Sequence, residues 1–213
     1  MKKKLIYNFF KRIFDLVCSL LAIIILAIPM FFVAIAIKID SKGPVLFKQK
    51  RVGKNKKLFN IYKFRSMRVD TDPNAPTHKL SDPKSYITKV GSFIRKTSID
   101  ELPQLFNIFI GNMSFVGPRP ALWNQDDLIQ ERDKYFANNV KPGLTGLAQI
   151  SGRDELEIPI KAKYDGDYVL KRGLFYDIWI IIRTVISVFR HEGVVEGGTG
   201  QLDVNNKEQR GEK

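Results

Sequence analysis

Residues 16–37 read LVCSLLAIIILAIPMFFVAIAI, an uncharged run of 22 residues in which Ser19 is the one clearly polar side chain. An α-helix rises about 1.5 Å per residue, so this run could just cross the roughly 30 Å hydrocarbon core of a bilayer. A cleaved signal peptide has a shorter apolar region of about 7 to 15 residues. The run therefore predicts a membrane helix that is retained in the protein.

Pro29 divides this run into 13 residues before it and 8 after it, and neither part alone is long enough to span a bilayer. Both flanks are basic, which favours the cytoplasmic side for both ends. A re-entrant helix, bent at Pro29 and returning to the face it entered, satisfies both observations. Proline is also tolerated in spanning helices, so these residues alone leave both paths open. The basic flanks are Lys2, Lys3, Lys4, Lys11 and Arg12 on one side, and ten Lys or Arg residues without an acid between Asp40 and Asp70 on the other.

The chain of 213 residues has a formal net charge of +13. This length suits one domain with a substantial core. The charge requires an anionic partner, for which nucleic acid, anionic lipid and phosphorylated substrates are the usual candidates. The single cysteine, Cys18, excludes an intrachain disulfide framework and a cysteine-based zinc site.

The remaining pattern predicts an α+β fold that is mostly helical. Residues 45–49 and 58–64 are expected to pair as a small β-hairpin around a Gly/Asn turn at 53–56. Residues 102–109 have helical spacing and end at Gly111, a typical helix C-cap. A further helix is predicted over 126–138.

Two later segments have less ordinary patterns. Phe115 to Pro120 reads FVGPRP and is expected to be irregular, with the backbone of Arg119 restricted by a proline on each side. Leu174 to Phe189 is aromatic and aliphatic, but Asp177 and Arg183 make it too charged to span a membrane. It is predicted as an amphipathic helix that lies in the core or on the membrane interface.

Asp100 and Glu101 stand side by side in KTSIDELPQLF, residues 96–106. Ser98 and Glu101 fit a capping box, which would explain both acids without any chemistry. Pro103 argues against that register, because it would be the fifth helical residue and would clash with the carbonyl of Ile99. A helix that starts at Asp100 avoids the clash and leaves an ionised carboxylate at the positive helix end. Such a carboxylate could act as a nucleophile toward phosphorus, and Glu101 could hold Mg²⁺.

Cationic side chains that could complete a phosphate site occur in several segments. Arginine binds phosphate oxygens with two parallel hydrogen bonds, and lysine acts as a point charge. No histidine stands in an obvious acid–base position, and the chain has no Walker-type or dinucleotide-binding loop. The candidate phosphate ligands are Lys63, Arg65, Arg95, Arg119 and Arg153.

These motifs occur in an order that resembles the bacterial sugar transferases, the monotopic phosphoglycosyl transferases that begin glycan assembly on polyprenol phosphate. The resemblance runs from about Lys11 to about Arg190, and the ordered set is far more specific than any one motif. The motifs are KRIFD (11–15), GPVLFKQ (43–49), YKFRSM (62–67), RKTSIDELPQL (95–105), MSFVGPRP (113–120), KPGLTG (141–146) and SGR (151–153).

The resemblance implies that a UDP-sugar donates its sugar-1-phosphate to undecaprenyl phosphate, with release of UMP. Asp100 would be the nucleophile that forms an aspartyl-phosphosugar intermediate, and Glu101 would support Mg²⁺. The family's cations, here Lys63, Arg95, Arg119 and Arg153, would bind phosphates or uridine. The product would initiate capsule, exopolysaccharide, O-antigen or glycoprotein glycan assembly.

The resemblance also implies a Pro-broken re-entrant helix in the bacterial inner membrane, with the active site facing the cytoplasm. The chain is expected to divide into a membrane segment (1–40), a catalytic domain (41–192) and a tail (193–213) whose polar, Gly-rich composition predicts disorder. This chain is similar to the family members that consist of the minimal catalytic unit. It departs from many relatives in having Ile28 before the proline, Asn112 in place of Asp, and Leu147 in place of Trp.

Two other functions are compatible with parts of this pattern. A glycosyltransferase acting on a lipid-linked acceptor would release UDP in place of UMP. A membrane-tethered basic module that binds nucleic acid or anionic lipid would explain the charge and the anchor, but it leaves the two adjacent acids without a role. The expected partners are therefore a UDP-sugar, undecaprenyl phosphate and membrane lipids, with no nucleic acid.

Overall fold

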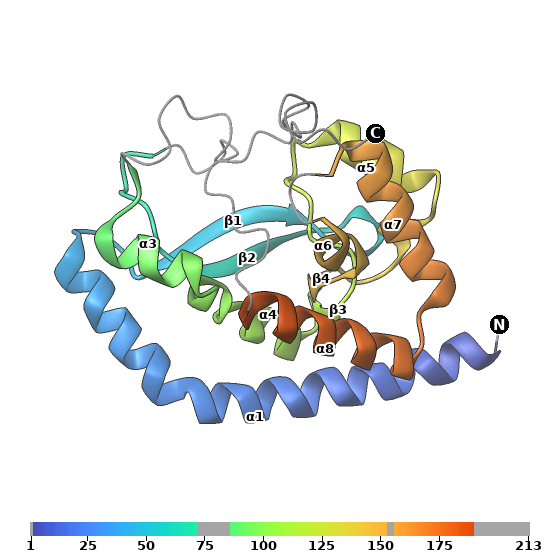
Figure 1. Cartoon of the computed structure of the whole chain (residues 1–213), viewed down its shortest axis with the longest axis horizontal. Coiled ribbons are helices and arrows are strands. Elements are labelled where there is room, and N and C mark those ends of the chain that lie inside the picture. The colour runs from blue at the N-terminus through green and yellow to red at the C-terminus, as the bar shows by residue number, and fades with distance from the viewer. Residues whose placement is uncertain (1, 72–85, 153–155, 190–213) are drawn as a thin grey trace, which may run out of the picture.

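The computed structural model describes residues 2–71, 86–152 and 156–189. It confirms an α+β fold that is mostly helical, with two small sheets (Figure 1). The predicted tail and most of the predicted loop over 70–86 lie outside the described residues. The elements, in chain order, are α1 (Lys2–Asp40), β1 (Leu46–Val52), η1 (Lys54–Lys56), β2 (Leu58–Phe64), α3 (Lys89–Lys96), η3 (Ile99–Glu101), α4 (Gln104–Ile110), β3 (Ser114–Val116), α5 (Asp126–Asp133), η4 (Ala137–Asn139), β4 (Gly143–Thr145), α6 (Leu147–Ser151), α7 (Ile158–Lys171) and α8 (Leu174–Phe189).

The predicted apolar helix is present as α1, a single helix of 39 residues that contains Pro29. Figure 1 shows it along the lower edge of the molecule, beneath α4 and α8, before it continues up the side that carries α3. Among the described residues it is the one helix long and apolar enough to cross a membrane, and only 11% of its most apolar window is buried inside the protein. A core helix would be mostly buried, so α1 offers its apolar surface outward. The re-entrant path stays a prediction.

The first half of α1 is attached to the rest of the protein by polar side chains. Arg12 donates hydrogen bonds to the carbonyls of Ile108 and Phe109 at 2.8 and 2.7 Å, where α4 ends. Asp15 accepts hydrogen bonds from the hydroxyl of Ser114 and the backbone N–H of Phe115. Helix ends leave carbonyls unsatisfied and attract cations, so Arg12 stabilises α4 while it docks α1.

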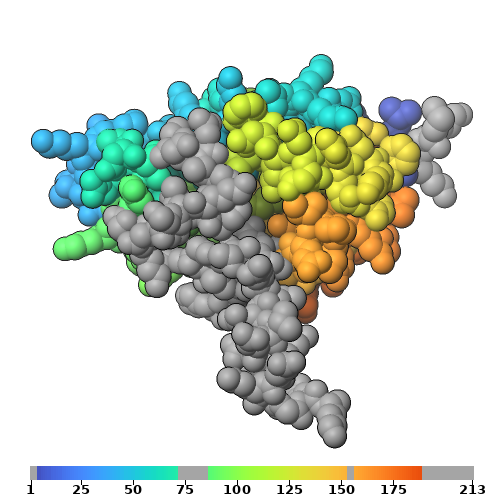
Figure 2. Space-filling view, turned by 90° about the horizontal axis from the view of Figure 1, so that it is seen from above, coloured from blue at the N-terminus to red at the C-terminus, as the bar shows by residue number. Residues whose placement is uncertain are grey.

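The predicted hairpin is confirmed. β1 and β2 pair antiparallel from Leu46 opposite Phe64 to Val52 opposite Leu58. Asn55 and Lys56 adopt left-handed backbone conformations that close the turn. Lys56 Nζ lies 2.7 Å from Asp133 Oδ2, which links the turn to the end of α5, and Figure 2 shows these regions side by side from above.

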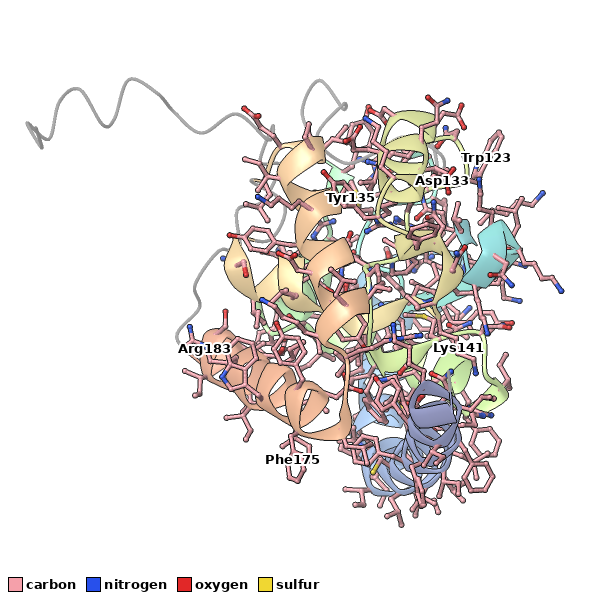
Figure 3. All side chains as sticks on the ribbon, turned by 90° about the vertical axis from the view of Figure 1, so that its right-hand side faces the viewer. Trp123, Asp133, Tyr135, Lys141, Phe175 and Arg183 are labelled. Carbon is pink, nitrogen blue, oxygen red and sulfur yellow. The ribbon has the colours of Figure 1, made fainter. Side chains whose placement is uncertain are left out.

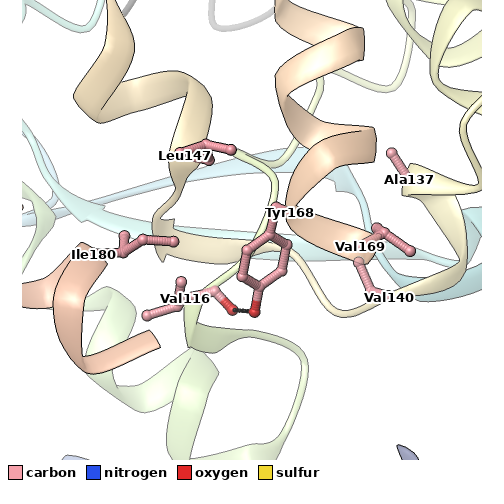
Figure 4. Close-up of a cluster of buried hydrophobic side chains, with 7 residues drawn as sticks. All are labelled: Val116, Ala137, Val140, Leu147, Tyr168, Val169 and Ile180. Carbon is pink, nitrogen blue, oxygen red and sulfur yellow. Dashed lines mark hydrogen bonds between the residues drawn. The ribbon is translucent and has the colours of Figure 1, made fainter. Parts of the chain in front are cut away.

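One buried cluster joins the two-stranded parallel sheet to the C-terminal helices. β3 and β4 pair in parallel, so the expectation that Phe115 to Pro120 is wholly irregular is wrong for its first two residues. The pairing residues of β4 belong to the KPGLTG segment, which is distant in the sequence. The local sequence around Phe115 therefore does not predict these hydrogen bonds. Tyr168 of α7 lies in the cluster with its hydroxyl 3.0 Å from the carbonyl oxygen of Val116 (Figure 4). The other members are Ala137, Val140, Leu147, Val169 and Ile180.

The predicted helix over residues 174–189 is confirmed with the same bounds, and it is amphipathic. Ile180 is fully buried, whereas Phe175 is 91% exposed and points away from the body of the protein beside α1 (Figure 3). Asp177 is one of the two charges that made the segment look too charged to span a membrane. Its side chain is buried, accepts a hydrogen bond from Tyr7 and forms an ion pair with Lys11. Both faces of α8 are therefore accounted for, one in the core and one outward.

A buried ion pair fastens α5 to α7. Arg132 donates to Asp165 Oδ2 through Nε and Nη2 at 2.8 and 2.6 Å, and the two side chains are 4% and 1% exposed. Burial raises the pKa of Asp165, while the Arg132 guanidinium opposes that shift. Removing one partner of such a pair leaves the other charge buried without compensation.

We expect Asp165→Asn to lower the free energy of unfolding by about 3 to 5 kcal/mol, because Arg132 keeps its charge in the core. Chemical unfolding in detergent micelles measures the change. The control is Glu131→Gln on α5, the helix that carries Arg132. Glu131 forms an ion pair with Lys134, which is 64% exposed, and we expect this substitution to change stability by less than about 0.5 kcal/mol. Equal effects of the two substitutions would contradict this account.

Candidate active site

The two adjacent acids lie in a tight turn. Ser98 adopts a left-handed conformation at φ 57°, and η3 then carries Asp100 and Glu101. The prediction that the helix starts at Asp100 is wrong, because α4 begins at Gln104 and has Pro103 as its N-cap. The Ser98 side chain makes no capping bond, so the simple capping box is not formed either. Pro103 has no N–H to donate, and it therefore suits the junction between the 3₁₀ turn and α4. The predicted end at Gly111 is confirmed.

Glu101 is shared by two cations from distant parts of the chain. Lys63 Nζ, at the end of β2, lies 2.7 Å from Glu101 Oε1 and 3.9 Å from Asp100 Oδ2. Arg119 Nη2 lies 3.0 Å from the same Glu101 oxygen. The two acidic side chains are 13% and 19% exposed, so the site is largely covered but still open to solvent.

The two carboxylates have different environments. Burial raises the pKa of Asp100, and the neighbouring Glu101 charge adds to this shift, while Lys63, Arg95 and Arg119 oppose it. Burial acts in the same direction on Glu101, but the charges and hydrogen bonds of Arg119 and Lys63 outweigh it and lower the pKa of that group. Carboxyl pairs with such divided pKa values are typical of active sites.

The backbone on both sides of Arg119 is fixed by hydrogen bonds. Before it, the carbonyl of Pro118 accepts from the N–H of Gly143 at 2.9 Å. After it, the carbonyl of Pro120 accepts from Arg51 Nη1 at 3.0 Å. These bonds tie the turn to β4 on one side and to β1 on the other. The two prolines and these hydrogen bonds hold Arg119 beside Glu101, where its side chain is 36% exposed.

The structure brings together four of the residues predicted for the site in addition to Glu101: Asp100, Lys63, Arg95 and Arg119. Arg95 occupies the last turn of α3, and its charge acts on the Asp100 carboxyl. Arg65 is placed elsewhere: it is 5% exposed and donates to the backbone carbonyls of Ser41 and Lys42 at 2.7 Å each. Arg153 lies outside the described residues.

Sequence reasoning missed the residues that support the site. Asn107 of α4 is fully buried, accepts a hydrogen bond from the N–H of Tyr62 and donates one to the carbonyl of Asn60. These bonds attach α4 to the edge of β2 that does not pair with β1. They therefore fix the strand of Lys63 beside the helix that follows Asp100 and Glu101. A polar residue among apolar positions of a predicted helix is a weak signal, but it could have indicated such a contact.

No group of three or more His, Cys, Asp or Glu side chains that could hold a metal ion occurs within residues 2–71, 86–152 and 156–189. The Asp100–Glu101 dyad therefore offers two carboxylates at most. Magnesium is commonly bound in this way, by one or two carboxylates together with water and substrate phosphates. The residues present fit a metal that arrives with a phosphorylated substrate.

Comparison with known proteins identifies relatives along most of the chain. An undecaprenyl-phosphate galactose phosphotransferase of Salmonella typhimurium is 40% identical over 202 residues, covering 87% of this chain and 42% of the relative. The exopolysaccharide production protein PSS of Rhizobium leguminosarum is 44% identical over 192 residues, covering 83% and 94%. A UDP-glucose:undecaprenyl-phosphate glucose-1-phosphate transferase of Escherichia coli is 38% identical over 187 residues, covering 84% and 40%.

The chain thus spans less than half the length of the Salmonella and Escherichia relatives and nearly the whole length of the Rhizobium one. Residues 6–191 match the family model described as bacterial sugar transferase. This range contains the dyad, all the cations placed around it and the motifs that attach α1. The chain belongs to the bacterial sugar transferase family.

Proposed function

We propose that the protein transfers sugar-1-phosphate from a UDP-sugar to undecaprenyl phosphate and releases UMP. The observation that carries this proposal is the largely covered Asp100–Glu101 dyad, whose cations come from β2, α3 and the Pro118–Pro120 turn. Phosphorylated substrates would be attracted to those cations. The names of the relatives, an undecaprenyl-phosphate galactose phosphotransferase and a glucose-1-phosphate transferase, support the same reaction class.

In this proposal Asp100 is the nucleophile. Its carboxylate oxygen attacks the phosphorus that carries the sugar, and the bond from that phosphorus to the bridging oxygen breaks, so that UMP leaves with the oxygen. An oxygen of undecaprenyl phosphate then attacks the same phosphorus and releases the Asp100 carboxylate. The covalent intermediate divides one difficult transfer into two and lets a water-soluble donor and a membrane-bound acceptor react in turn.

Lys63, Arg95 and Arg119 would hold the phosphate oxygens and stabilise the negative charge that develops during transfer. Glu101 has a lowered pKa and stays ionised, so it would serve as the carboxylate that supports Mg²⁺. The metal would supply additional positive charge at the phosphates. The ion pairs that Glu101 makes with Lys63 and Arg119 would orient those side chains toward an incoming donor.

The proposed location is the cytoplasmic face of the bacterial inner membrane, with α1 re-entrant and bent at Pro29. The outward apolar surfaces of α1 and α8 support this placement. Along α1, Ile25 and Ile28 are 71% and 69% exposed, and Phe175 of α8 is 91% exposed. Side chains of this kind would be costly in water and favourable in lipid.

The proposed role is the first step of glycan assembly. The relatives include an exopolysaccharide production protein, and two carry galactose or glucose in their names. A hexose-1-phosphate is therefore the first group to test as the transferred unit, using a panel of UDP-sugars with UMP as the measured product.

We expect Asp100→Asn to reduce UMP release by roughly 10³-fold or more, because loss of a covalent nucleophile typically has effects of this size. Mass spectrometry of the wild-type protein incubated with donor alone should show a phosphosugar adduct on Asp100, which the variant lacks. Asp126→Asn, the same change on an exposed residue of α5, is the matched control and should retain activity. Full activity of Asp100→Asn, or release of UDP, would contradict the proposed reaction.

We expect the acidic limb of kcat/KM for the donor to lie above the usual aspartate pKa of about 4, because burial raises the pKa of Asp100. The ionised form is the nucleophile, so activity is complete above the raised pKa and is lost as the pH falls through it. Lys63→Met removes the strongest opposing charge and should move the limb to higher pH. Lys48→Met, at an exposed position on the opposite strand of the hairpin, should not. A limb that stays near 4 in all three proteins would rule out Asp100 as the titrating group.

A further inference from the structure

The apolar residues on either side of the dyad pack against the second half of α1. Ile99 and Leu102 flank the two acids and pack against a buried cluster that contains Met30 and Ile37 of α1. The cluster also holds Phe64, the residue next to Lys63, and Ile94, the residue next to Arg95. Three elements that bring charged groups to the site, β2, α3 and η3, therefore place an apolar side chain in the same cluster as the second half of α1. The Arg119 turn does not.

Arg65 fixes the end of that helix. Its Nη1 donates to the carbonyl of Lys42 at 2.7 Å, and its Nη2 donates to the carbonyl and hydroxyl oxygens of Ser41 at 2.7 and 2.8 Å. The carbonyl of Ile37 lies within 3.4 Å of the same nitrogen. Ser41 and Lys42 directly follow Asp40, the last residue of α1, and Ile37 lies in its last turn. The buried guanidinium therefore binds the end of the helix and the two residues that leave it.

Two further contacts make this junction specific. Gly43 has φ of 123°, which strains any other residue, and a Cβ atom there would lie 2.1 Å from Arg65 Nη1, so a larger residue would force the guanidinium to move. Asp40, the last residue of α1, accepts a hydrogen bond from the N–H of Val90 at 3.0 Å, near the start of α3. The end of α1 is thus joined both to the segment after Lys63 and to the helix that carries Arg95.

We propose that Arg65 is a positioning residue, which locks the end of α1 against β2 and thereby holds the apolar floor of the Asp100–Glu101 dyad in place. The proposal rests on the proposed function only for its kinetic test. It replaces the expectation that Arg65 binds phosphate. Arg65 is 5% exposed, and both of its terminal nitrogens donate to backbone carbonyls. It is therefore badly placed to reach a substrate.

The kinetic test compares Arg65→Met and Arg65→Lys with the wild type, using full-length protein in lipid nanodiscs and UDP-sugar as donor. A displaced dyad should lower kcat about 100-fold, as a shift of about 1 Å at reacting groups can do, while KM for the donor changes less than about threefold. Lysine keeps the positive charge and has one donor group in place of the two terminal nitrogens of arginine. Arg65→Lys should therefore have a smaller effect on kcat than Arg65→Met. Arg68→Met removes an exposed arginine paired with Asp70 and should leave both constants unchanged.

A second measurement does not depend on any activity. In η3 and the start of α4, the amides of Glu101, Leu102 and Leu105 are hydrogen bonded to carbonyls three residues earlier. Hydrogen–deuterium exchange of these amides in nanodiscs should become faster in Arg65→Met and stay unchanged in Arg68→Met. Gly43→Ala, which collides with Arg65 from the other side of the junction, should reproduce the faster exchange and serves if Arg65→Met does not fold.

The outcomes are distinguishable. A large increase in KM with kcat retained would show that Arg65 binds the donor and would overturn the proposal, as would unchanged kcat and unchanged exchange in Arg65→Met and Gly43→Ala. If the wild type released no UMP from any donor, the proposed function would fail. The exchange experiment would then still decide whether Arg65 holds the dyad turn.

Discussion

The site depends on the compensation of one largely covered negative charge. Glu101 lies beside Asp100 in a turn where both side chains are less than one-fifth exposed, and nearby cations favour the ionised form of such carboxylates. Lys63 and Arg119 supply them at 2.7 and 3.0 Å from the same oxygen. These residues come from the end of β2 and from a proline-bounded turn, so the ion pairs hold three distant segments in one arrangement.

The need to position these cations explains much of the surrounding structure. The Arg119 turn is held by β4 and β1, and the strand of Lys63 is held by Asn107 of α4. α4 is in turn stabilised at its C-terminal end by Arg12 of α1. α1 therefore has two kinds of surface. Many of its apolar side chains face outward, while Arg12 and Asp15 face the protein and find hydrogen-bonding partners there.

Features that depend on local sequence could be predicted. The hairpin, the C-cap at Gly111 and the bounds of α8 follow from turn residues and apolar spacing, and all three agree with the structure. The start of α4 could not be placed, because Pro103 excludes one register without choosing among the others. The pairing of β3 with β4 joins segments almost thirty residues apart, and strands of three residues give no periodic signal. α7 was not predicted at all.

The two basic residues of YKFRSM show why a motif does not assign a role. Lys63 and Arg65 are two positions apart, so a continuous strand would point both side chains to the same face. β2 ends at Phe64, however, and Arg65 turns to the end of α1 while Lys63 reaches the dyad. The GPVLFKQ motif contains Gly43, against which Arg65 packs, and KRIFD contains the Arg12 and Asp15 that dock α1. In this chain, several residues of these motifs therefore maintain the geometry around the dyad, because a carboxylate turn that packs on α1 needs both halves of that helix to be fixed.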